Sequence, residues 1–384
     1  MPFQSHFDFR CPTQLIHGPG SIARLAECFS ADSRVLVVSD KGLVASGVVS
    51  QATAVLEEAG LGYALFEGVL GNPPARCVQA GYKLYQKESC TALLGLGGGS
   101  PMDVAKMIGV LAVHGGTINQ YLGTDKVEGD LPPLVCVPTT YGTGSEVTPF
   151  AVLTNPKTNN KDAVISWKIA PRVGILDADL SVGLPPELGA ATGMDALTHA
   201  LESYTNLQAT PLTEGIALQA IRLIGENIRL ACANSHELEA TDRMLVASAL
   251  AGVAFAQTRL GNVHAMSHPL GARFGVHHGL ANAVLLPHVM DFNLPARVDK
   301  FVVIARELGV DTNRLAPRQA AQKAVYAVRQ LNADLGIAAH LGETGVKATA
   351  IGAMAKTAML SANIAINPRL TRQEDIEAIY RAAM

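Results

Sequence analysis

The chain has 384 residues, of which 48% are hydrophobic and 16% charged, and its formal net charge at pH 7 is −3. This length exceeds what one hydrophobic core usually serves, so two domains are expected. Acidic and basic residues are interspersed and nearly balanced, which argues against a nucleic-acid-binding surface or a polybasic membrane-binding patch. Small molecules are therefore the expected ligands.

The N-terminal segment and the cysteines bear on the compartment. The opening MPFQSHFDFRCPTQ lacks a basic stretch followed by an apolar run, so no secretory signal is predicted. No uninterrupted apolar stretch approaches the roughly 18 to 20 residues needed to cross a bilayer. The six cysteines form no C-x-x-C pair, which predicts reduced, mostly buried thiols. We expect a soluble cytoplasmic protein.

Short apolar runs alternate with helix-like segments in the first half of the chain. Near-continuous Val, Leu and Ile runs that end in Gly, Ser, Thr or Asp predict parallel strands buried on both faces. These runs occupy residues 34–40, 91–100, 133–140 and 172–179. Helical periodicity dominates the second half. We therefore expect an α/β domain over residues 1–180 and a helical domain over residues 181–384, sharing a cleft.

Polar side chains follow two of these strands. Asp40 stands where a carboxylate can accept hydrogen bonds from the ribose hydroxyls of a dinucleotide, and it would repel a 2′-phosphate, which favours NAD over NADP. An aspartate at a strand end is also a common turn residue. The stretch PTTYGTGSEVT, residues 138–148, could likewise line a cofactor site or form an ordinary loop.

The stretch LLGLGGGSPMDVAK runs from an apolar strand through glycines into a helix. Ser100 is expected at the N-cap, Pro101 at the first helical position and Asp103 at the third, as in a capping box. Three glycines would let a ligand approach the backbone, and the helix start attracts an anion such as a pyrophosphate. An ordinary glycine-rich turn is the alternative. These glycines are Gly97, Gly98 and Gly99.

In TGMDALTHALESYTN, Asp195 and His199 lie four residues apart in an Ala- and Leu-rich segment that Thr192 can cap. This spacing places both side chains on one face of a helix. A surface pair or a hydrogen-bonded buried pair would have the same spacing. A metal site therefore requires further donors.

The stretch GNVHAMSHPLGARFGVHHGLAN supplies such donors. His264 and His268 repeat the four-residue spacing, and Pro269 suits the end of their helix. Four of the eleven histidines of the chain fall in this stretch, which scattered structural histidines explain poorly. One oxygen and three nitrogen donors would suit zinc or ferrous iron. The predicted metal ligands are Asp195, His199, His264 and either His277 or His278.

The chain resembles the iron-containing (group III) alcohol dehydrogenases over essentially its whole length. The resemblance rests, in order, on GGGSPMDVAK, PTTYGTGSEVT, ATGMDALTHALE, VHAMSHPLGARFGVHHGLANAVLLPH and INPR. It implies a dehydroquinate synthase-like fold, with an N-terminal Rossmann-like domain that binds NAD and a C-terminal helical domain that binds catalytic iron. It further implies interconversion of an alcohol and its aldehyde.

The resemblance also implies which residues contact each ligand. Family members have P-H-G where this chain has His277, His278 and Gly279, so His278 would be the fourth metal ligand beside Asp195, His199 and His264. With Gly97, the implied cofactor contacts are Asp40, Asn72, Gly98, Gly99, Ser100, Thr139, Thr140 and Lys161. The chain departs from the family pattern at Tyr141, Val276, Ser361 and Asn363.

The energetics explain why such an enzyme would use a metal. An alcohol must lose its proton before hydride leaves, at a cost of roughly 12 kcal/mol for about nine pK units. General-base catalysis alone is worth about 3 to 5 kcal/mol. A Lewis-acidic metal would close most of this gap. His268 is the candidate for relaying the proton or supporting the ligands, and a structural histidine at a helix end is the alternative.

The expected function is therefore a cytoplasmic NAD-dependent, metal-dependent alcohol dehydrogenase that acts on a primary alcohol, with Fe²⁺ as the expected metal and Zn²⁺ as the alternative. Polyol dehydrogenases of the glycerol or 1,3-propanediol type, and a cyclising synthase, share the two-domain plan. A metal-dependent hydrolase or a non-catalytic metal-binding protein would make the cofactor signals coincidental. The family resemblance suggests a homodimer or an assembly of dimers, with no nucleic-acid or membrane partner.

Overall fold

The structure is a computed structural model of the chain and describes residues 6–155 and 161–384. Two compact units divide it: one is Cys11–Val182, and the other is Gly183–Met384 with the described residues of Met1–Arg10. Arg10 joins the helical unit because its backbone N–H and C=O both bond the side chain of Gln257. Residues 1–5 of the opening segment, and the asparagines before Lys161, lie outside the described residues.

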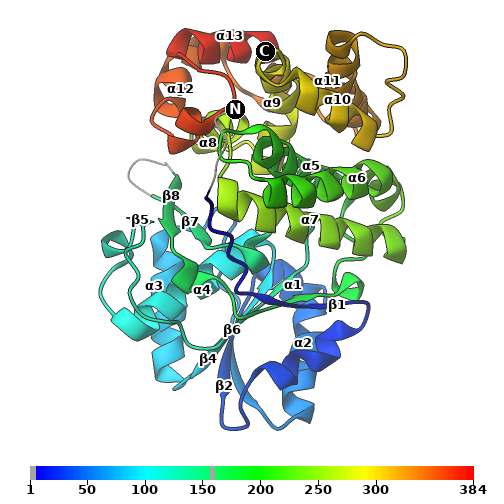
Figure 1. Cartoon of the computed structure of the whole chain (residues 1–384). Helices are drawn as coiled ribbons and strands as arrows, with labels where there is room; N and C mark the ends of the chain where they lie inside the picture. The colour runs from blue at the N-terminus through cyan, green and yellow to red at the C-terminus, as the bar shows by residue number, and fades with distance from the viewer. Residues whose placement is uncertain (1–5, 156–160) are drawn as a thin grey trace. The chain divides into compact units, whose positions relative to one another are not determined.

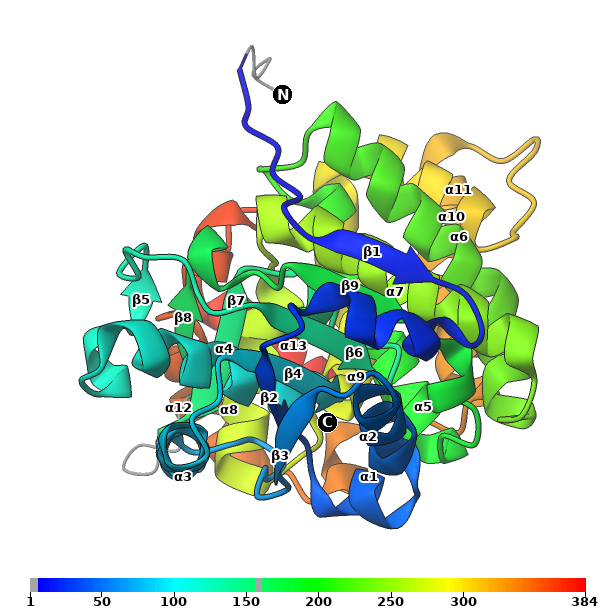
Figure 2. The same ribbon diagram turned by 90° about the horizontal axis from the view of Figure 1, so that it is seen from below.

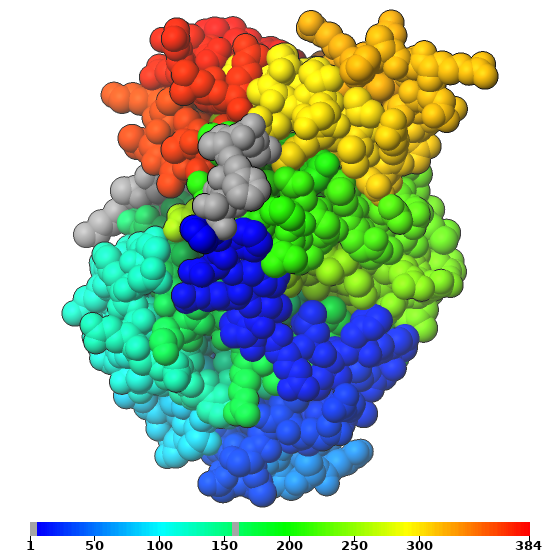
Figure 3. Space-filling model, viewed as in Figure 1, coloured from blue at the N-terminus to red at the C-terminus, as the bar shows by residue number. Residues whose placement is uncertain are grey.

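The α/β unit is built on a sheet whose paired strands all run parallel, as predicted. Among the described residues its strand order is β1 (Gln14–His17), β9 (Val173–Leu176), β6 (Leu134–Pro138), β4 (Ala92–Gly97), β2 (Arg34–Val38) and β3 (Gly62–Phe66). β1 is an edge strand with three exposed residues, and Figure 3 shows the blue segment that contains it at the surface.

Residues of the strands alternate between two apolar cores. In β2, Leu36 and Val38 belong to one core, and Val35 and Val37 belong to the other. Each core is covered by helices, so Figure 2 shows helices on both sides of the sheet. Both faces of the Val- and Leu-rich strands are therefore dry. The first face packs on α3 (Ala75–Lys87) and α4 (Gly99–His114), and the second on η1 (Ser21–Cys28), α1 (Lys41–Ala45) and α2 (Val48–Glu58).

A smaller sheet completes this unit. Its order is β5 (Gly123–Thr124), β8 (Lys161–Ile165) and β7 (Phe150–Thr154), with β7 and β8 antiparallel. Short 3-10 helices lie in the connections: η2 (Ile118–Gln120), η3 (Ser145–Val147), η4 (Trp167–Ile169) and η5 (Ala178–Leu180).

The helical unit contains no strand in the part that the structure describes (Figure 1). α5 packs on α6, α7 and α9, and every residue of α5 from Gly189 to Thr205 is buried. Polar groups on this helix must therefore find partners inside the protein. The helices are α5 (Pro186–Thr205), α6 (Pro211–Ala233), α7 (Leu238–Thr258), α8 (Asn262–Phe274), α9 (His278–Asn293), α10 (Val298–Glu307), α11 (Pro317–Asp334), α12 (Ile351–Ala358) and α13 (Gln373–Ala383).

Two expected helix boundaries are wrong. α5 begins at Pro186, so Thr192 lies inside the helix, where its hydroxyl donates to the Leu188 carbonyl at 2.9 Å. Pro269 also lies inside its helix, since α8 continues to Phe274. α5 begins instead with Pro186 at its first position and Glu187 in its first turn, which is itself a helix-start pattern. α8 continues past Pro269 while it packs on α9 and α12.

The structure also shows the state of the cysteines and the hydropathy of the helices. None of the six cysteines, all of which lie in the described ranges, forms a disulfide, and four of them are buried. Within the described ranges, no single helix is both long and apolar enough to cross a bilayer. The bent pair α7 and α8, with 104° between them, meets the length and composition requirement together.

Candidate active site

Three imidazole nitrogens surround one carboxylate oxygen in the helical unit. The Nε2 atoms of His199, His264 and His278 lie 3.8, 3.7 and 3.8 Å from Asp195 Oδ1. These distances are too long for hydrogen bonds. They approach the spacing of about 3.4 Å between two atoms bound tetrahedrally at about 2.1 Å to one ion. The structure thus brings the expected ligand set together.

Three helices position these side chains. Asp195 and His199 lie one turn apart on α5, His264 lies in the first turn of α8, and His278 begins α9. Donor atoms of Asp195, His199 and His264 all lie within 4.8 Å of one another, and these three residues are buried. The His278 side chain is 34% exposed, so the cluster is open to solvent on that side.

A glycine allows α9 to reach α5 at this point. A Cβ on Gly279 would lie 2.1 Å from the Ala191 carbonyl oxygen and 3.4 Å from Asp195 Cβ. Any side chain there would push the start of α9, and with it His278, away from Asp195. His277, one residue earlier, is exposed and precedes the helix.

Asn282 was not predicted from the sequence. Its Nδ2 lies 2.6 Å from Asp195 Oδ1 and 3.2 Å from the Nε2 atoms of both His264 and His278. Its Oδ1 is buried without a hydrogen-bond partner among the described residues. A usable signal existed, because Asn282 lies four residues after His278 and therefore on the same face of α9.

Glu202 was also missed. Its Oε2 lies 2.7 Å from His264 Nδ1, on the side of the ring away from Asp195. Asp195, His199 and Glu202 have the i, i+4, i+7 spacing of one helix face, which could have identified the third residue. A carboxylate behind a metal-binding histidine is a recurring arrangement in metal sites.

The electrostatics of the cluster favour a cation. Burial raises the pKa of Asp195, but the imidazoles of His199, His278 and His264 outweigh burial and hold this pKa well below its usual range. Burial lowers the pKa of His264, but the carboxylates of Asp195 and Glu202 outweigh it and raise this pKa. The donor set of one carboxylate oxygen and three imidazole nitrogens therefore fits a borderline divalent metal.

His268 lies one turn after His264 on α8 and is partly exposed. Its ring stacks on the ring of His278, with 5.6 Å between their centroids. Because α8 continues beyond it, His268 is not a helix-end residue. Its ring therefore lies next to the four proposed ligands but is not one of the three imidazoles around Asp195 Oδ1.

In the α/β unit, the predicted cofactor residues gather at the carboxyl ends of neighbouring strands. Asp40 follows β2, the glycine loop follows β4, and Thr139 and Thr140 follow β6. The chain runs from β2 outward to β3 and then back to β4, so the order reverses between β2 and β4. Ligands of doubly wound sheets bind at such a switch point.

Gly97 is required at the turn that leaves β4. Its φ is +144°, and a Cβ there would lie 2.8 Å from both Leu43 Cδ1 and Pro101 Cγ. The Gly97 carbonyl accepts the Thr139 N–H at 3.0 Å, which joins the two strand ends. A Cβ on Gly99 would lie 2.9 Å from Thr143 Cγ2. The loop after β6 therefore packs directly on the glycine loop.

The predicted capping box at α4 is wrong. Gly98, not Ser100, is the N-cap residue, and no side chain caps this helix. Asp103 instead points inward, where it accepts hydrogen bonds from Ser145 Oγ at 2.7 Å and Val152 N at 2.9 Å. Lys106, which is buried, donates to Ser145 Oγ and to the carbonyls of Thr148 and Phe150. This network holds the loop after β6 on α4.

The other expected cofactor residues, Asp40, Asn72 and Lys161, already have hydrogen-bond partners within the chain. Asp40 Oδ1 accepts the backbone N–H groups of Gly42 and Leu43, so the turn role is present, while its Oδ2 takes part in neither bond. Asn72 adopts a φ of +54°, and its Oδ1 accepts a hydrogen bond from Lys161 Nζ at 2.5 Å. Tyr141, where the chain departs from the family pattern, is only 2% exposed, so its ring is turned into the interior.

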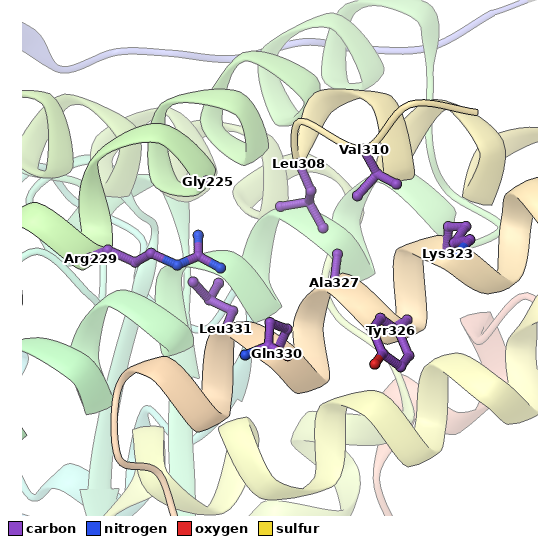
Figure 4. Close-up of a pocket in the computed structure, with 9 residues that line it drawn as sticks. All are labelled: Gly225, Arg229, Leu308, Val310, Lys323, Tyr326, Ala327, Gln330 and Leu331. Carbon is purple, nitrogen blue, oxygen red and sulfur yellow. The ribbon is translucent and has the colours of Figure 1, made fainter. Parts of the chain in front are cut away.

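A pocket elsewhere in the helical unit offers different chemistry. Figure 4 shows it between α6 and α11, with a volume of about 230 Å³. Its lining mixes aliphatic with long polar side chains, and the guanidinium of one lining residue, Arg229, is already paired with Asp334 at 2.7 Å. None of the four proposed metal ligands lines this pocket. The lining residues are Gly225, Arg229, Leu308, Val310, Lys323, Tyr326, Ala327, Gln330 and Leu331.

Two protein-family models match the chain. The model described as iron-containing alcohol dehydrogenase matches residues 12–178, and the model described as Fe-containing alcohol dehydrogenase family, C-terminal, matches residues 189–384. The chain therefore belongs to the iron-containing alcohol dehydrogenase family. It is an alcohol oxidoreductase, and the family implies a bound metal. The predicted family and fold class are confirmed.

Relatives are similar over nearly their whole length. The chain is 44% identical to the 1,3-propanediol dehydrogenase of Citrobacter freundii, over 98% of each chain. It is 38% identical to the NAD-dependent methanol dehydrogenase of Bacillus methanolicus, over 98% of this chain and 100% of that one. A crystal structure of 1,3-propanediol oxidoreductase, 44% identical, matches with a TM-score of 0.97 over 99% of this chain and 100% of that chain.

Glu146 provides a test of the network beside the glycine loop. Its side chain is 1% exposed, and burial raises its pKa to about 7, although Lys106 opposes this shift. Between about pH 5 and 7 the folded state therefore keeps a proton that the unfolded state has lost, so the free energy of unfolding falls as the pH rises. The shift is worth up to about 3 kcal/mol.

We expect Glu146→Gln to remove the contribution of this proton to the pH dependence of the free energy of unfolding. The decrease in the thermal unfolding midpoint of the α/β unit between pH 5 and pH 8 should be smaller in the variant than in the wild-type protein. Glu128→Gln, at an exposed position, is the matched control and should leave the decrease unchanged. An equal decrease in wild type and Glu146→Gln would show that Glu146 is not held protonated.

Proposed function

We propose that this protein is an NAD-dependent, metal-dependent dehydrogenase that interconverts a small primary alcohol and its aldehyde. The observation that carries the proposal is the approach of three imidazole nitrogens to one buried Asp195 oxygen, in a family that implies a metal. In the oxidative direction the alcohol loses its hydroxyl proton and a hydride from its carbon. NAD⁺ accepts the hydride, and the products are the aldehyde, NADH and a proton.

The residues of the helical unit have distinct roles in this proposal. A divalent metal, Fe²⁺ with Zn²⁺ as the alternative, supplies Lewis acidity toward the substrate oxygen when bound. Asp195 contributes the negative charge, and His199, His264 and His278 present nitrogen donors. Burial of the first three keeps bulk water from the donor atoms. His268, partly exposed and stacked on His278, is placed to pass the released proton to solvent.

The α/β unit supplies a site that suits a dinucleotide. Backbone N–H groups at the start of α4, next to the glycine loop, can bind the pyrophosphate. Asp40 stands at the adjacent strand end, where a carboxylate can accept the ribose hydroxyls and disfavour a 2′-phosphate. The other proposed cofactor contacts are Gly97, Gly98, Gly99, Ser100, Thr139, Thr140, Asn72 and Lys161.

A diol is the second candidate substrate. The 44% identity to a 1,3-propanediol dehydrogenase, over nearly the whole of both chains, favours it. The relative that is named a methanol dehydrogenase favours a simple alcohol instead. Both substrates present a primary hydroxyl, so the same donor set serves either one.

The setting of the enzyme is part of the proposal. We take it to act in the cytoplasm, as a homodimer or an assembly of dimers, on a freely diffusing alcohol or aldehyde. Near-balanced charge gives it no basis for binding nucleic acid or a membrane surface.

The metal ligands can be tested by single substitutions. His264→Ala and His278→Ala each remove one nitrogen donor, and we expect the bound metal to be lost together with at least about 1,000-fold of kcat/KM, or about 4 kcal/mol. Metal content is measured by elemental analysis after anaerobic purification, and turnover by NADH absorbance. His277→Ala, at the exposed neighbouring histidine, should change neither quantity. Full metal content and activity in the first two variants would remove the proposed site.

The cofactor preference can be tested at Asp40. Asp40→Asn removes the charge but keeps an oxygen that can cap α1. We expect the ratio of kcat/KM with NADP⁺ to that with NAD⁺ to rise about tenfold or more, since a repulsion of about 1.4 kcal/mol is relieved. Glu58→Gln, an exposed change on α2, is the control. An unchanged ratio would contradict the role of Asp40.

The substrate class can be tested with propan-1-ol and propane-1,3-diol. A general primary-alcohol dehydrogenase should oxidise both, with kcat/KM values within about tenfold of each other, because the second hydroxyl is worth little without a partner that binds it. A larger preference for the diol would select the second candidate. Turnover of phosphate esters without NAD would point to a hydrolase and contradict both.

A further inference from the structure

The carboxylate of Glu202 accepts three hydrogen bonds in the interior of the helical unit. Its Oε2 lies 2.7 Å from His264 Nδ1 and 2.9 Å from the Gly261 N–H, and its Oε1 lies 2.6 Å from the Val263 N–H. The residue is 6% exposed. One side chain of α5 therefore binds both the backbone and a side chain at the start of α8.

The contact with His264 determines which ring nitrogen carries the proton. A carboxylate only accepts hydrogen bonds, so the neutral imidazole must hold its proton on Nδ1. The lone pair then lies on Nε2, the atom 3.7 Å from Asp195 Oδ1. The Asn282 amide nitrogen, a donor, faces the same Nε2 at 3.2 Å. Both neighbours of the ring thus select the tautomer that can bind a metal.

The backbone contacts fix where that ring lies. Gly261 is the N-cap residue of α8 and Val263 its second residue, so their N–H groups have no partner within the helix. Glu202 satisfies both and anchors this turn to α5. A Cβ on Gly261 would lie 2.9 Å from Glu202 Oε1, so glycine permits the close approach. His264 belongs to the same turn and is held with it.

We propose that Glu202 is a positioning residue that sets the metal affinity of the site by holding His264 in its metal-binding tautomer and orientation. This inference rests on the proposed function, because it assumes that His264 binds the metal. Glu202 acts through His264 and through the start of α8. Removing such a partner of a metal-binding histidine typically lowers metal affinity about 10- to 100-fold.

The discriminating change is Glu202→Gln, which keeps the size and removes the charge. Its amide cannot accept all three hydrogen bonds in either orientation. If its NH₂ group faces His264 Nδ1 and the Gly261 N–H, the ring would move its proton to Nε2, where it blocks metal binding. If its NH₂ group faces the Val263 N–H instead, the start of α8 loses one bond to α5 and His264 loses the charge behind its ring, which also lowers metal affinity. We expect zinc-loaded Glu202→Gln to lose its metal at a chelator concentration about 10- to 100-fold lower than the wild-type protein requires.

Controls separate this effect from a general weakening of the helix start. Thr371 Oγ1 accepts a hydrogen bond from the Asn262 side-chain amide at 2.9 Å, so it anchors the same turn through a residue other than His264. Thr371→Val should lower the thermal midpoint while leaving the chelator midpoint unchanged. Glu202→Asp keeps a carboxylate and should retain zinc better than Glu202→Gln does.

The readout is zinc per protomer against chelator concentration, independent of alcohol turnover. If the wild-type protein holds neither Zn²⁺ nor, under anaerobic loading, Fe²⁺, the proposed function fails. If wild type and Glu202→Gln release zinc at the same concentration, only the inference about Glu202 fails. Equal losses in Glu202→Gln and Thr371→Val would also overturn it, since loosening of the helix start would then explain both.

The tautomer can be measured without any variant at this position, should the substitutions prevent folding. Long-range ¹⁵N–¹H spectra of the zinc-loaded protein, labelled at histidine, report the protonation of each ring nitrogen. His264→Ala identifies the signal of His264. We expect a protonated Nδ1 and a metal-bound Nε2 for that ring. Metal binding through Nδ1, or an unprotonated Nδ1, would contradict the proposal.

Discussion

The structure of the helical unit depends on placing the Asp195 carboxylate on a helix with no solvent-facing side. A charge in such a position is costly unless donors or a cation compensate it. Here the imidazoles of His199, His264 and His278, and the amide of Asn282, gather around one oxygen. Glu202 adds a second buried carboxylate one turn beyond His199. Two buried carboxylates among imidazole and amide groups make a metal ion the natural partner of this site.

A related constraint operates in the α/β unit. On α4, the half-buried Asp103 and the buried Lys106 both hydrogen-bond to Ser145 Oγ. Their other partners are backbone groups of the segment after β6. α4 thereby holds the segment after β6 in place, and the start of the same helix lies next to the glycine loop. The shape of the proposed cofactor site therefore depends on a buried network behind it as well as on the glycines themselves.

The sequence was sufficient where a residue's role follows from periodicity along one element. Continuous Val and Leu runs predicted the parallel strands, and the four-residue spacings predicted the faces carrying Asp195, His199 and His264. The errors at Thr192, Ser100 and Asp103 arose because a capping pattern is local, whereas the structure used these positions for packing or for contacts far along the chain. Glu202 and Asn282 were missed because spacing reports the face of a helix, but not which atoms the opposite helix presents to it.

The glycines at the helix starts show why the ligand residues alone do not define the site. At Gly279 and Gly261, a side chain would collide with the Ala191 carbonyl or with the Glu202 carboxylate. Each glycine stands next to a proposed ligand or one turn before it, where α9 and α8 meet α5. A histidine can reach the Asp195 oxygen only if its backbone comes this close, so the positions of the donors are determined by backbone contact before any ligand binds. A chain with the same four ligands but bulkier residues at these two positions would hold them too far apart to share one ion.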